Sequence, residues 1–451
     1  MAIHSDTIAA LATPAGVSAL ALIRISGKDT KAVAAAALGS APRPRVATHC
    51  DYIGAGGAID DVVATLYEGP NSYTGEDSLE IACHGSPFIA RKILSDLLGR
   101  GCRPAGPGEF TQRAFLNGRM DLSQAEAVMD LISARSDRSL AAARAVLRGA
   151  LGRHLAGLTE GLVGALATVE AYIDFPDEDL PPEDGARLSE RVAAVLAGTD
   201  RLLATERTGA LLRHGFATVI LGEANAGKSS LLNRMLGDER AIVSPEPGTT
   251  RDFIEAPASA GPHALRLVDT AGLNPRATGI EAVGVERALE QARSADILLV
   301  VADAARPVPP LPPALGECIN KSNTIFVLNK ADLLGGRAPA AAAPPGFTAV
   351  AVSALTGQGI GALVGEIARL AEAMQDTVGE ERIAINVRHA HYLALARSCL
   401  GSALAKIAER APSELLASDL RGALDAFGEI SGRVDNERML DQLFASFCIG
   451  K

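Results

Sequence analysis

The chain has 451 residues, 48 % of them hydrophobic, and a formal net charge of -10. Its length predicts two or three domains, and its apolar fraction excludes global disorder. The acidic balance excludes a nucleic-acid binder that relies on a basic surface alone, and leaves open a nucleic-acid substrate held by a local patch.

Cysteine usage and hydropathy indicate the compartment. Six cysteines lie far apart without a C-x-x-C pair, which fits neither a zinc site nor a secreted disulfide framework. The N-terminus "MAIHSDTIAA" lacks a signal-peptide pattern, and no stretch has the length and apolar character to cross a bilayer. We therefore expect a cytoplasmic protein without a membrane partner.

The first part of the chain alternates short β-branched runs with Gly and Pro. The runs are "VSALALIRISG", "DDVVATLYEGP" and "DSLEIACHGSP". This pattern predicts an α+β domain over residues 1–119.

Helical patterns follow, and they flank a segment of different character. Ser123 and Glu126 have capping-box spacing, which predicts a helix start. Apolar residues with helical spacing mark two further helices: Leu151, Leu155, Leu158, Leu162, Leu166 and Val169; Leu188, Val192, Val195, Thr199 and Leu202. Strands and helices alternate over residues 212–376, so this α/β module reads as an insertion between helical parts at 120–211 and 377–451. Separate consecutive helical domains are the alternative.

The strongest chemical signal is a phosphate loop at the start of this module. "TVILGEANAGKSSLLN" joins a strand, a Gly-rich turn and a helix start, and Gly222 to Ser229 fit G-x-x-x-x-G-K-S. Backbone N–H groups of such a loop surround phosphates, Lys228 reaches the outer phosphates, and the Ser229 hydroxyl can hold Mg²⁺. The predicted contact residues are Asn225, Ala226, Gly227, Lys228, Ser229 and Ser230.

Three further motifs follow in the order expected of a Ras-like P-loop GTPase. They are "DTAG", "NKAD" and "SAL", each after a predicted strand. Asp269 can reach Mg²⁺, and Asp332 can accept two hydrogen bonds from guanine, a pair of donors that adenine lacks. The pattern therefore predicts GTP as the nucleotide, with these residues at its site: Asp269, Thr270, Ala271, Gly272, Asn329, Lys330, Asp332, Ser353 and Ala354.

The residues around the predicted hydrolysis site are unlike those of the signalling GTPases. Leu273 follows "DTAG", where a water-positioning glutamine is usual. Thr250 in "GTTRD" is placed to join Ser229 on Mg²⁺. The Asn225 side chain and the carbonyl-rich turn "SPEPGTT" suit a monovalent cation, although a turn-forming role explains Asn225 equally well.

Motifs inside and outside the α/β module together resemble one family. "GEANAGKSSLLN", "PGTTRD", "DTAGL" and "NKADL" combine with "SYTGEDSLE", "PGEFTQRAFLNGRMDLSQAEA", "YIDFPDED" and the terminal "FCIGK". This combination is similar, over the whole chain, to the MnmE (TrmE) family of tRNA modification GTPases. The resemblance implies an N-terminal folate-binding domain that dimerises, a discontinuous helical domain, and a potassium-dependent GTPase domain inserted within it.

The resemblance also implies the reaction and the partners. With an FAD-dependent partner, MnmG, in an expected heterotetramer, the homodimer installs an aminomethyl or carboxymethylaminomethyl group. The group goes to the 5-position of the wobble uridine of tRNA, from the one-carbon unit of 5-formyltetrahydrofolate or a related tetrahydrofolate. GTP, Mg²⁺ and K⁺ are expected to bring two G domains together, and hydrolysis to release them.

Residue roles carried over from the resemblance fall into three groups. Glu281 matches the glutamate that orients water and would act with Lys228 and Thr250, although by itself it reads as a surface helix residue. The predicted cation ligands are Ser229 and Thr250 for Mg²⁺, and Asn225, Ser244, Glu246 and Thr249 for K⁺. Arg24, Glu80 and Arg119 match positions that hold tetrahydrofolate, although each alone would more often be a surface charge.

The terminal "LFASFCIGK" allows three interpretations: a frayed tail, a lipidation box, or one wall of a binding site. Gly450 and Lys451 do not fit a lipidation box. A frayed tail is disfavoured by an apolar helical face: Met439, Leu440, Leu443, Phe444 and Phe447. The resemblance places Lys451 close to the folate and Cys448 near the one-carbon unit; a purely structural role for Cys448 stays open.

Two other classes share part of this pattern. A ribosome-assembly GTPase has the nucleotide motifs, but normally adds a basic RNA-binding domain. A folate-dependent enzyme with a regulatory G domain would turn over one-carbon units without the partner.

Overall fold

The computed structural model describes the chain in several ranges: 6–174, 185–237, 255–269, 280–308, 313–375, 383–432, 440, 443–445 and 447–450. At 269, 280–285, 287 and 375 only the backbone is described. Contacts divide the chain into two compact units. One comprises Met1–Met129, Leu147–Asp174 and Ser413–Lys451, and the other comprises Asp130–Val146 and Phe175–Pro412.

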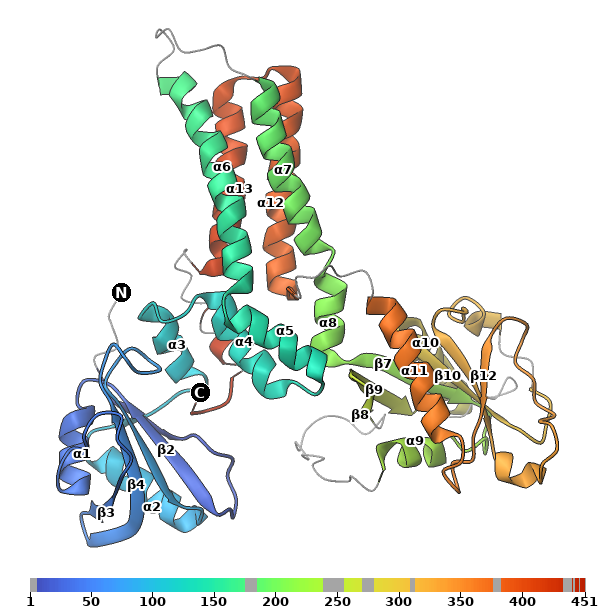
Figure 1. Ribbon diagram of the computed structural model, residues 1–451, viewed down its shortest axis with the longest axis horizontal. Coiled ribbons are helices and arrows are strands. Elements are labelled where there is room, and N and C mark those ends of the chain that lie inside the picture. Colours follow the sequence, from blue (N-terminus) through green and yellow to red (C-terminus); the bar gives the residue numbers. More distant parts are fainter. Residues whose placement is uncertain are drawn as a thin grey trace. The chain divides into compact units, whose positions relative to one another are not determined.

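The first unit contains a mixed sheet with six described strands in the order β3-β4-β5-β2-β1-β6 (Figure 1). The strands are β1 (Ile8–Leu11), β2 (Leu20–Ser26), β3 (Thr48–Gly54), β4 (Gly57–Tyr67), β5 (Ser78–His84) and β6 (Arg103–Pro104). The helices nearest them in the chain are α1 (Thr30–Leu38), α2 (Pro87–Gly99) and α3 (Glu109–Leu116). This confirms the α+β character expected of the N-terminal part.

Strand alternation separates the two faces of this sheet. Ile23 and Ile25 of β2 and Ile81 of β5 are fully buried in one cluster with residues of α1 and α2. Because neighbouring residues of a strand point to opposite faces, Arg24 and Glu80 lie on the other face. The β2–β5 register places these two residues directly opposite each other.

Helices complete the first unit. They are α4 (Leu122–Ser133), α6 (Ala150–Asp174) and α13 (Ser413–Ser431), and α6 packs along α13 (Figure 1). The apolar face predicted for α6 is confirmed, since Leu151, Leu155, Leu162 and Val169 are buried.

The start of α4 differs from the prediction. Asp121 Oδ1 accepts a hydrogen bond from the Gln124 N–H (2.8 Å), and Gln124 Oε1 accepts one from the Asp121 N–H (2.9 Å). The capping box is therefore Asp121–Gln124 and not Ser123–Glu126. The earlier start lets Leu122 join a buried cluster that contains Phe444 and Phe447, and tertiary packing of this kind outweighs local capping preference.

The second unit contains the α/β module. Its described sheet has the order β12-β11-β10-β7-β9-β8, parallel except for β8. The strands are β7 (Phe216–Gly222), β8 (Glu255–Ala260), β9 (His263–Asp269), β10 (Ile297–Asp303), β11 (Thr324–Asn329) and β12 (Thr348–Ala351). The helices are α9 (Lys228–Leu236), α10 (Ile280–Ser294) and α11 (Ile360–Gln375), with short 3₁₀ turns η1 (Pro313–Leu315) and η2 (Ala331–Leu334).

Both faces of this sheet are covered, as expected of a parallel sheet. Ile220 of β7 packs with residues of α9 and α11, whereas its neighbours Val219 and Leu221 pack with residues of α10. This is the P-loop GTPase fold that the motif order predicts.

Helices on both sides of the module in the sequence belong to this second unit. They are α5 (Asp137–Leu147), α7 (Gly185–Leu203), α8 (Glu206–His214) and α12 (Val387–Glu409). Helix α7, before the module, packs along α12, which follows it (Figure 1). Chain segments separated by the module therefore pair, and the alternative of consecutive helical domains is wrong. Within the described residues, none of the helices combines the length and apolar character needed to cross a membrane.

Candidate functional site

The phosphate loop lies between the buried strand β7 and helix α9. Gly222 has φ +152° and Gly227 φ +92°, conformations that L side chains rarely adopt. A Cβ at Gly222 would come within 2.3 Å of the Val301 carbonyl oxygen, and one at Gly227 within 2.2 Å of Asn329 Nδ2. Both glycines are thus required by close approach as well as by backbone conformation.

The side chains of the loop differ in burial and in their partners. Lys228 is 8 % exposed, and its Nζ donates hydrogen bonds to the carbonyl oxygens of Gly222 (3.1 Å) and Glu223 (2.9 Å). Ala226 is buried, whereas the side chains of Asn225, Ser229 and Ser230 are exposed. The loop and the first turn of α9 therefore present N–H groups, a cation and hydroxyls together.

Asn329 joins the phosphate loop to the predicted base site. Its side chain is 2 % exposed; Nδ2 donates to the Ala226 carbonyl oxygen (2.9 Å) and Oδ1 accepts from the Ala354 N–H (3.0 Å). Ser353 Oγ donates to Asp332 Oδ1 (2.5 Å). The structure therefore brings together the predicted residues of three motifs that lie far apart in the sequence.

Two residues of this site were missed in the sequence. Asp303 ends β10, and its Oδ2 accepts a hydrogen bond from Lys330 Nζ (2.9 Å), which lowers the pKa of the Asp303 carboxyl. Arg234 of α9 donates to the carbonyl oxygens of Ala354 (3.0 Å) and Leu355. Asp303 could have been found in the sequence, because it is the polar residue that ends the apolar run "ILLVVAD". No feature of the sequence pointed to Arg234.

Other predicted site residues lie outside the described part. They are Ser244, Glu246, Thr249, Thr250, Thr270, Ala271, Gly272 and Lys451. Asp269 and Glu281 have a described backbone only, at the end of β9 and in the first turn of α10. The Mg²⁺ and K⁺ ligand sets and the catalytic role of Glu281 therefore stay predictions.

A second polar site lies on the face of the N-terminal sheet opposite the buried cluster of Ile23, Ile25 and Ile81. Arg24 Nε and Nη2 donate to Glu80 Oε1 (3.1 and 2.7 Å), and Nη1 donates to the Gly450 carbonyl oxygen (3.3 Å). The guanidinium carbon lies 5.6 Å from the centre of the Tyr73 ring and 5.8 Å from that of Phe110. Arg24 and Glu80 thus meet each other and the C-terminal segment at one place.

Arg119, the third residue of the predicted folate set, is exposed and lies against the loop that contains Gly75. A Cβ at Gly75 would come within 3.3 Å of Arg119 Cγ. The structure brings Arg119 to this loop; among the described residues, it makes no hydrogen bond or ion pair with Arg24 or Glu80.

The C-terminal segment is bound and not frayed as far as Gly450. Ile449 forms a β-bridge with Pro107, and the Gly108 N–H donates to the Cys448 carbonyl oxygen (3.2 Å). Phe444 and Phe447 are buried, whereas the Cys448 side chain is exposed.

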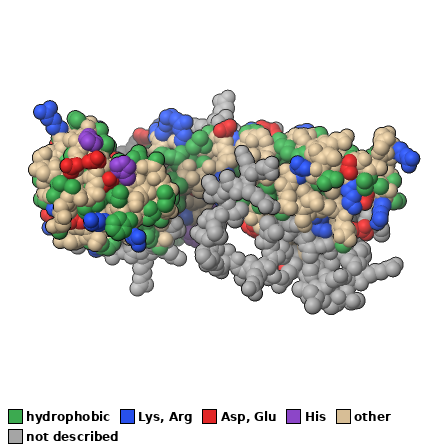
Figure 2. Space-filling view, turned by 90° about the horizontal axis from the view of Figure 1, so that it is seen from below, with side chains coloured by type: hydrophobic (Ala, Val, Ile, Leu, Met, Phe, Trp, Pro, Cys, Tyr) green, Lys and Arg blue, Asp and Glu red, His purple; other side chains and the backbone are tan. Residues whose placement is uncertain are grey.

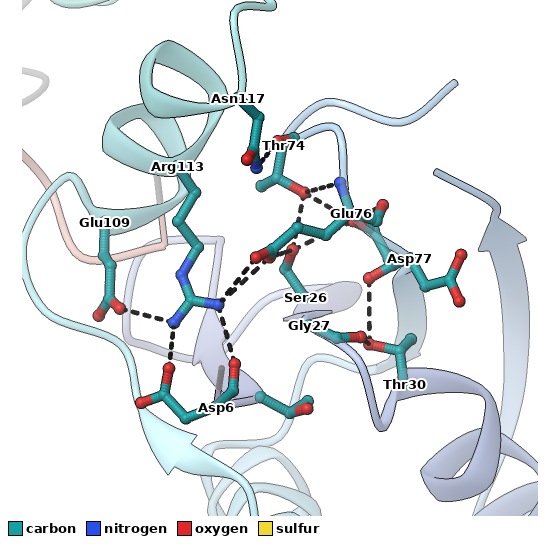
Figure 3. A network of polar contacts seen from close by, with 12 residues as sticks. Asp6, Ser26, Gly27, Thr30, Thr74, Glu76, Asp77, Glu109, Arg113 and Asn117 are labelled. Carbon is teal, nitrogen blue, oxygen red and sulfur yellow. Dashed lines mark hydrogen bonds and ion pairs between the residues drawn. The ribbon is translucent and has the colours of Figure 1, made fainter. Parts of the chain in front are cut away.

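A buried network supports the loop of residues 72–77 (Figure 3). Arg113 is 2 % exposed and donates to Glu76 Oε2 (3.2 Å), Glu109 Oε1 (3.0 Å) and Asp6 Oδ1 (2.8 Å). Ser26, two positions after Arg24, donates to Glu76 Oε2 (2.7 Å). Charge-assisted hydrogen bonds of this kind hold the loop to the strand that carries Arg24.

Comparison with known proteins covers the whole chain. Residues 7–119 match the family model described as GTP-binding protein TrmE N-terminus, and residues 122–448 match the MnmE helical domain. A protein of Opitutus terrae called tRNA modification GTPase MnmE is 55 % identical over 447 residues, 99 % of both chains. Proteins of the same name from Akkermansia muciniphila and Symbiobacterium thermophilum are 44 % and 42 % identical, also over 99 % of both chains.

Proposed function

Because the chain belongs to the MnmE family of tRNA modification GTPases, we propose that it couples potassium-dependent GTP hydrolysis to a folate-dependent modification of wobble uridine. The chain is a GTP hydrolase that takes part in tRNA modification. The observation that carries the nucleotide part of the proposal is the Asn329 side chain, which joins the phosphate loop to the "SAL" loop beside Asp332. This arrangement suits one guanine nucleotide held at both ends.

Each group at the nucleotide site has a distinct task. Loop N–H groups and Lys228 hold the phosphates, and the Asp332 carboxylate accepts hydrogen bonds from guanine. An exposed hydroxyl in the first turn of α9 makes Ser229 a suitable Mg²⁺ ligand, and the ion would neutralise phosphate charge. Thr250 is proposed as its second ligand and Glu281 as the group that orients water.

The potassium dependence rests on the phosphate loop and its neighbours. Asn225 has φ +64° and an exposed side chain directly before Ala226. An amide oxygen there, with the carbonyl oxygens proposed at Ser244, Glu246 and Thr249, is the hard oxygen set that K⁺ accepts. Such a cation would supply positive charge next to the phosphates, where other GTPases use an arginine.

Potassium dependence is tested by the rate of GTP hydrolysis in matched KCl and NaCl. We expect the wild type to be faster in KCl, and Asn225→Ala to lose this difference because its side-chain oxygen is gone. A Gln358→Ala variant, changed at an exposed position of the same module, should keep the difference. Equal wild-type rates in the two salts would contradict the cation proposal.

The folate site is proposed at Arg24 and Glu80. A guanidinium with one edge on Glu80 and another on the Gly450 carbonyl can exchange the carbonyl for an anionic or carbonyl group of a tetrahydrofolate. Arg119 and Lys451 are proposed as further cationic contacts, and the exposed Cys448 lies two residues before the carbonyl that Arg24 binds. Together they suit 5-formyltetrahydrofolate or a related tetrahydrofolate.

The proposed partners are a second copy of the chain, an FAD-dependent MnmG in a heterotetramer, and tRNA. A surface for the second copy is suggested by Val17, Leu20 and Phe88, which are 91, 63 and 66 % exposed. The Ser18 N–H donates to the Gly85 carbonyl oxygen (3.0 Å) and the Gly85 N–H donates to the Ala19 carbonyl oxygen (3.2 Å), so these two segments are held together. Figure 2 shows hydrophobic side chains at the surface of this N-terminal part, at the left of the view. The tRNA substrate leads us to propose a cytoplasmic location.

Nucleoside mass spectrometry on tRNA from cells lacking this protein tests the whole proposal. We expect loss of the 5-substituted wobble uridine, with recovery on expressing the wild type but not Lys228→Ala, because the variant lacks the cation that holds the phosphates. An Arg91→Ala variant, changed at an exposed site on α2, is the matched control and should restore the nucleoside. An unchanged nucleoside profile in the deletion strain would contradict the proposal.

A further inference from the structure

The hairpin of β8 and β9 connects two segments that the nucleotide motifs occupy. β8 begins at Glu255, shortly after the "GTTRD" motif, and β9 ends at Asp269, the first residue of "DTAG". The strands pair without interruption from Glu255 opposite Val268 to Ala260 opposite His263. Because the two strands are hydrogen-bonded along their whole length, we expect the hairpin to move as one element. A displacement of its end beside the nucleotide motifs would then also displace its turn.

The turn of this hairpin is anchored through His263. The residue is 2 % exposed, and its ring meets the Phe216 ring edge-on at 5.7 Å and 86°. His263 Nε2 lies 3.0 Å from Glu372 Oε2 on α11. One carboxylate oxygen of Glu372 therefore binds the hairpin.

The other oxygen of the same carboxylate binds a helix outside the α/β module. Arg138 Nη2, on α5, donates a hydrogen bond to Glu372 Oε1. Burial opposes ionisation of Glu372, but hydrogen bonds with Arg138 and His263 outweigh it and lower the pKa of the carboxyl. The ionised Glu372 carboxylate thus links α5, through Oε1, to the hairpin, through Oε2.

A separate contact fixes the chain that leads into α5. Asp130 Oδ2 accepts from Arg213 Nε (2.9 Å), and the same guanidinium donates to the carbonyl oxygens of Ile385 (2.8 Å) and Ala384 (3.1 Å). A Cβ at Gly209 would come within 2.2 Å of the Ile385 oxygen, so α8 needs glycine there. Arg213, at the end of α8 where the chain enters the α/β module, therefore binds both the segment that leaves the module and the end of α4.

A small pocket lies on one side of helix α5. Its volume is about 20 Å³, it is open to solvent, and its lining includes Ala142, Ala143 and Val146 of α5 and Leu212 of α8. The helix is thus held at Asp130 and at Arg138. Ala142, Ala143 and Val146 of α5 are buried, so a displacement of this helix would be small.

We propose that Glu372 is a positioning residue for GTP hydrolysis, which holds the β8–β9 hairpin to α5 and couples the nucleotide state to the position of that helix. A contribution to stability alone explains the arrangement less well. The Arg138 and Glu372 side chains are 34 and 43 % exposed, and ion pairs at such exposure add little to folding. The coupling uses only the established GTPase activity and none of the cation, folate or partner proposals.

Hydrogen exchange on the full-length chain tests the coupling. We expect exchange in residues 137–147 to differ between GDP and a non-hydrolysable GTP analogue. Glu372→Gln should abolish this difference and lower kcat by about 2- to 30-fold, with KM for GTP within about 2-fold, as expected for loss of an indirect coupling. Equal melting temperatures would show that the effect is not loss of folding.

Two further variants distinguish the contact of Glu372 with α5 from its contact with the hairpin. Arg138→Gln breaks the contact between Glu372 and α5 and keeps the contact between Glu372 and His263, so it should abolish the exchange difference and keep kcat within about 2-fold of the wild type. Glu366→Gln, on the same helix α11, removes a surface pair with Arg369 (2.8 Å) and should keep both properties. The proposal would be overturned if hydrogen exchange in α5 of the wild type were the same with GDP and with the GTP analogue, or if the difference persisted in Glu372→Gln. It would also be overturned if Glu366→Gln lost the exchange difference and kcat as Glu372→Gln does.

Discussion

Arg113 lies inside the first unit among three carboxylates, those of Asp6, Glu76 and Glu109 (Figure 3). Arg103 adds a second cation, with its Nη2 2.5 Å from Glu109 Oε1. Burial alone would raise the pKa of Asp6, but hydrogen bonds from Arg103 and Arg113 lower it to about 2. The pKa of Glu109 is likewise lowered, against its burial, by Arg103, the Gly106 N–H and Arg113.

Acid should therefore destabilise this unit. Because the folded-state pKa values are depressed, the carboxylates stabilise the fold fully above their unfolded pKa values, and this contribution is lost as the pH falls from about 4 towards about 2. Urea unfolding followed by tyrosine fluorescence measures it, since Tyr52, Tyr67 and Tyr73 lie in this unit and the chain has no Trp.

A variant of Arg113 tests whether this network causes the loss of stability in acid. Arg113→Met should lower the free energy of unfolding at pH 7 by about 3–5 kcal/mol, because it removes the cation that pairs with the mostly buried Glu76 and leaves Asp6 and Glu109 with Arg103 alone. It should also weaken the dependence on acid. Arg91→Met, at an exposed position of the same unit, should match the wild type. A wild-type midpoint that stays constant from pH 7 to pH 3 would contradict the role of this network.

At the scale of elements, the C-terminal segment is held by a glycine and a β-bridge. Gly108 has φ +63°, and a Cβ there would lie 2.8 Å from Phe447 Cβ and 3.0 Å from the Phe444 carbonyl oxygen. The Gly108 N–H also binds the Cys448 carbonyl. Close approach at Gly108 is therefore what lets this segment lie against the start of α3.

Gly108→Ala should release the C-terminal segment. The side chain meets Phe447 and strains a positive φ, so we expect carboxypeptidase to remove the last residues several-fold faster than from the wild type. Gly106→Ala is the control, because a Cβ at Gly106 comes no closer than 3.6 Å to Glu109 Oε2. Equal rates for Gly108→Ala and Gly106→Ala would show that the segment is held by other contacts.

At the scale of the whole molecule, the α/β module is an insertion whose flanking helices pair. The helical stripes on α6 and α7 predicted two amphipathic helices, but not their partners. The packing of α6 on α13 and of α7 on α12 joins segments more than 150 residues apart. Ordering a long intervening segment adds little loop entropy, so such an insertion is compatible with a stable helical part.

The proposed dimer is also a property of the whole molecule. Leu20→Glu combined with Phe88→Glu should shift the chain from dimer to monomer in light scattering, because it places charge on the exposed apolar surface. GTP hydrolysis at low protein concentration should change little. Val387→Glu, at a residue 76 % exposed on α12, is the control and should leave the mass unchanged. A double variant that stays dimeric would place the interface elsewhere.

The amino-acid sequence by itself determined the nucleotide chemistry and the module that carries it. Phosphate-loop, "DTAG", "NKAD" and "SAL" motifs are short, each follows its own strand, and parallel strands bring their ends to one edge of a sheet. Arg24 and Glu80 were indicated only by the family resemblance, and the β2–β5 register of the structure is what places them opposite each other.

Tertiary structure alone decided which distant residues meet. Asp121 displaced Ser123 as the cap of α4 because Leu122 packs against the C-terminal segment. The pairs Arg24 with Gly450, Arg213 with Ile385, and Arg138 with Glu372 join residues more than 150 positions apart. Long polar side chains carry no periodic signal of their partners, and only the packing of the elements brings their charged ends within hydrogen-bonding distance.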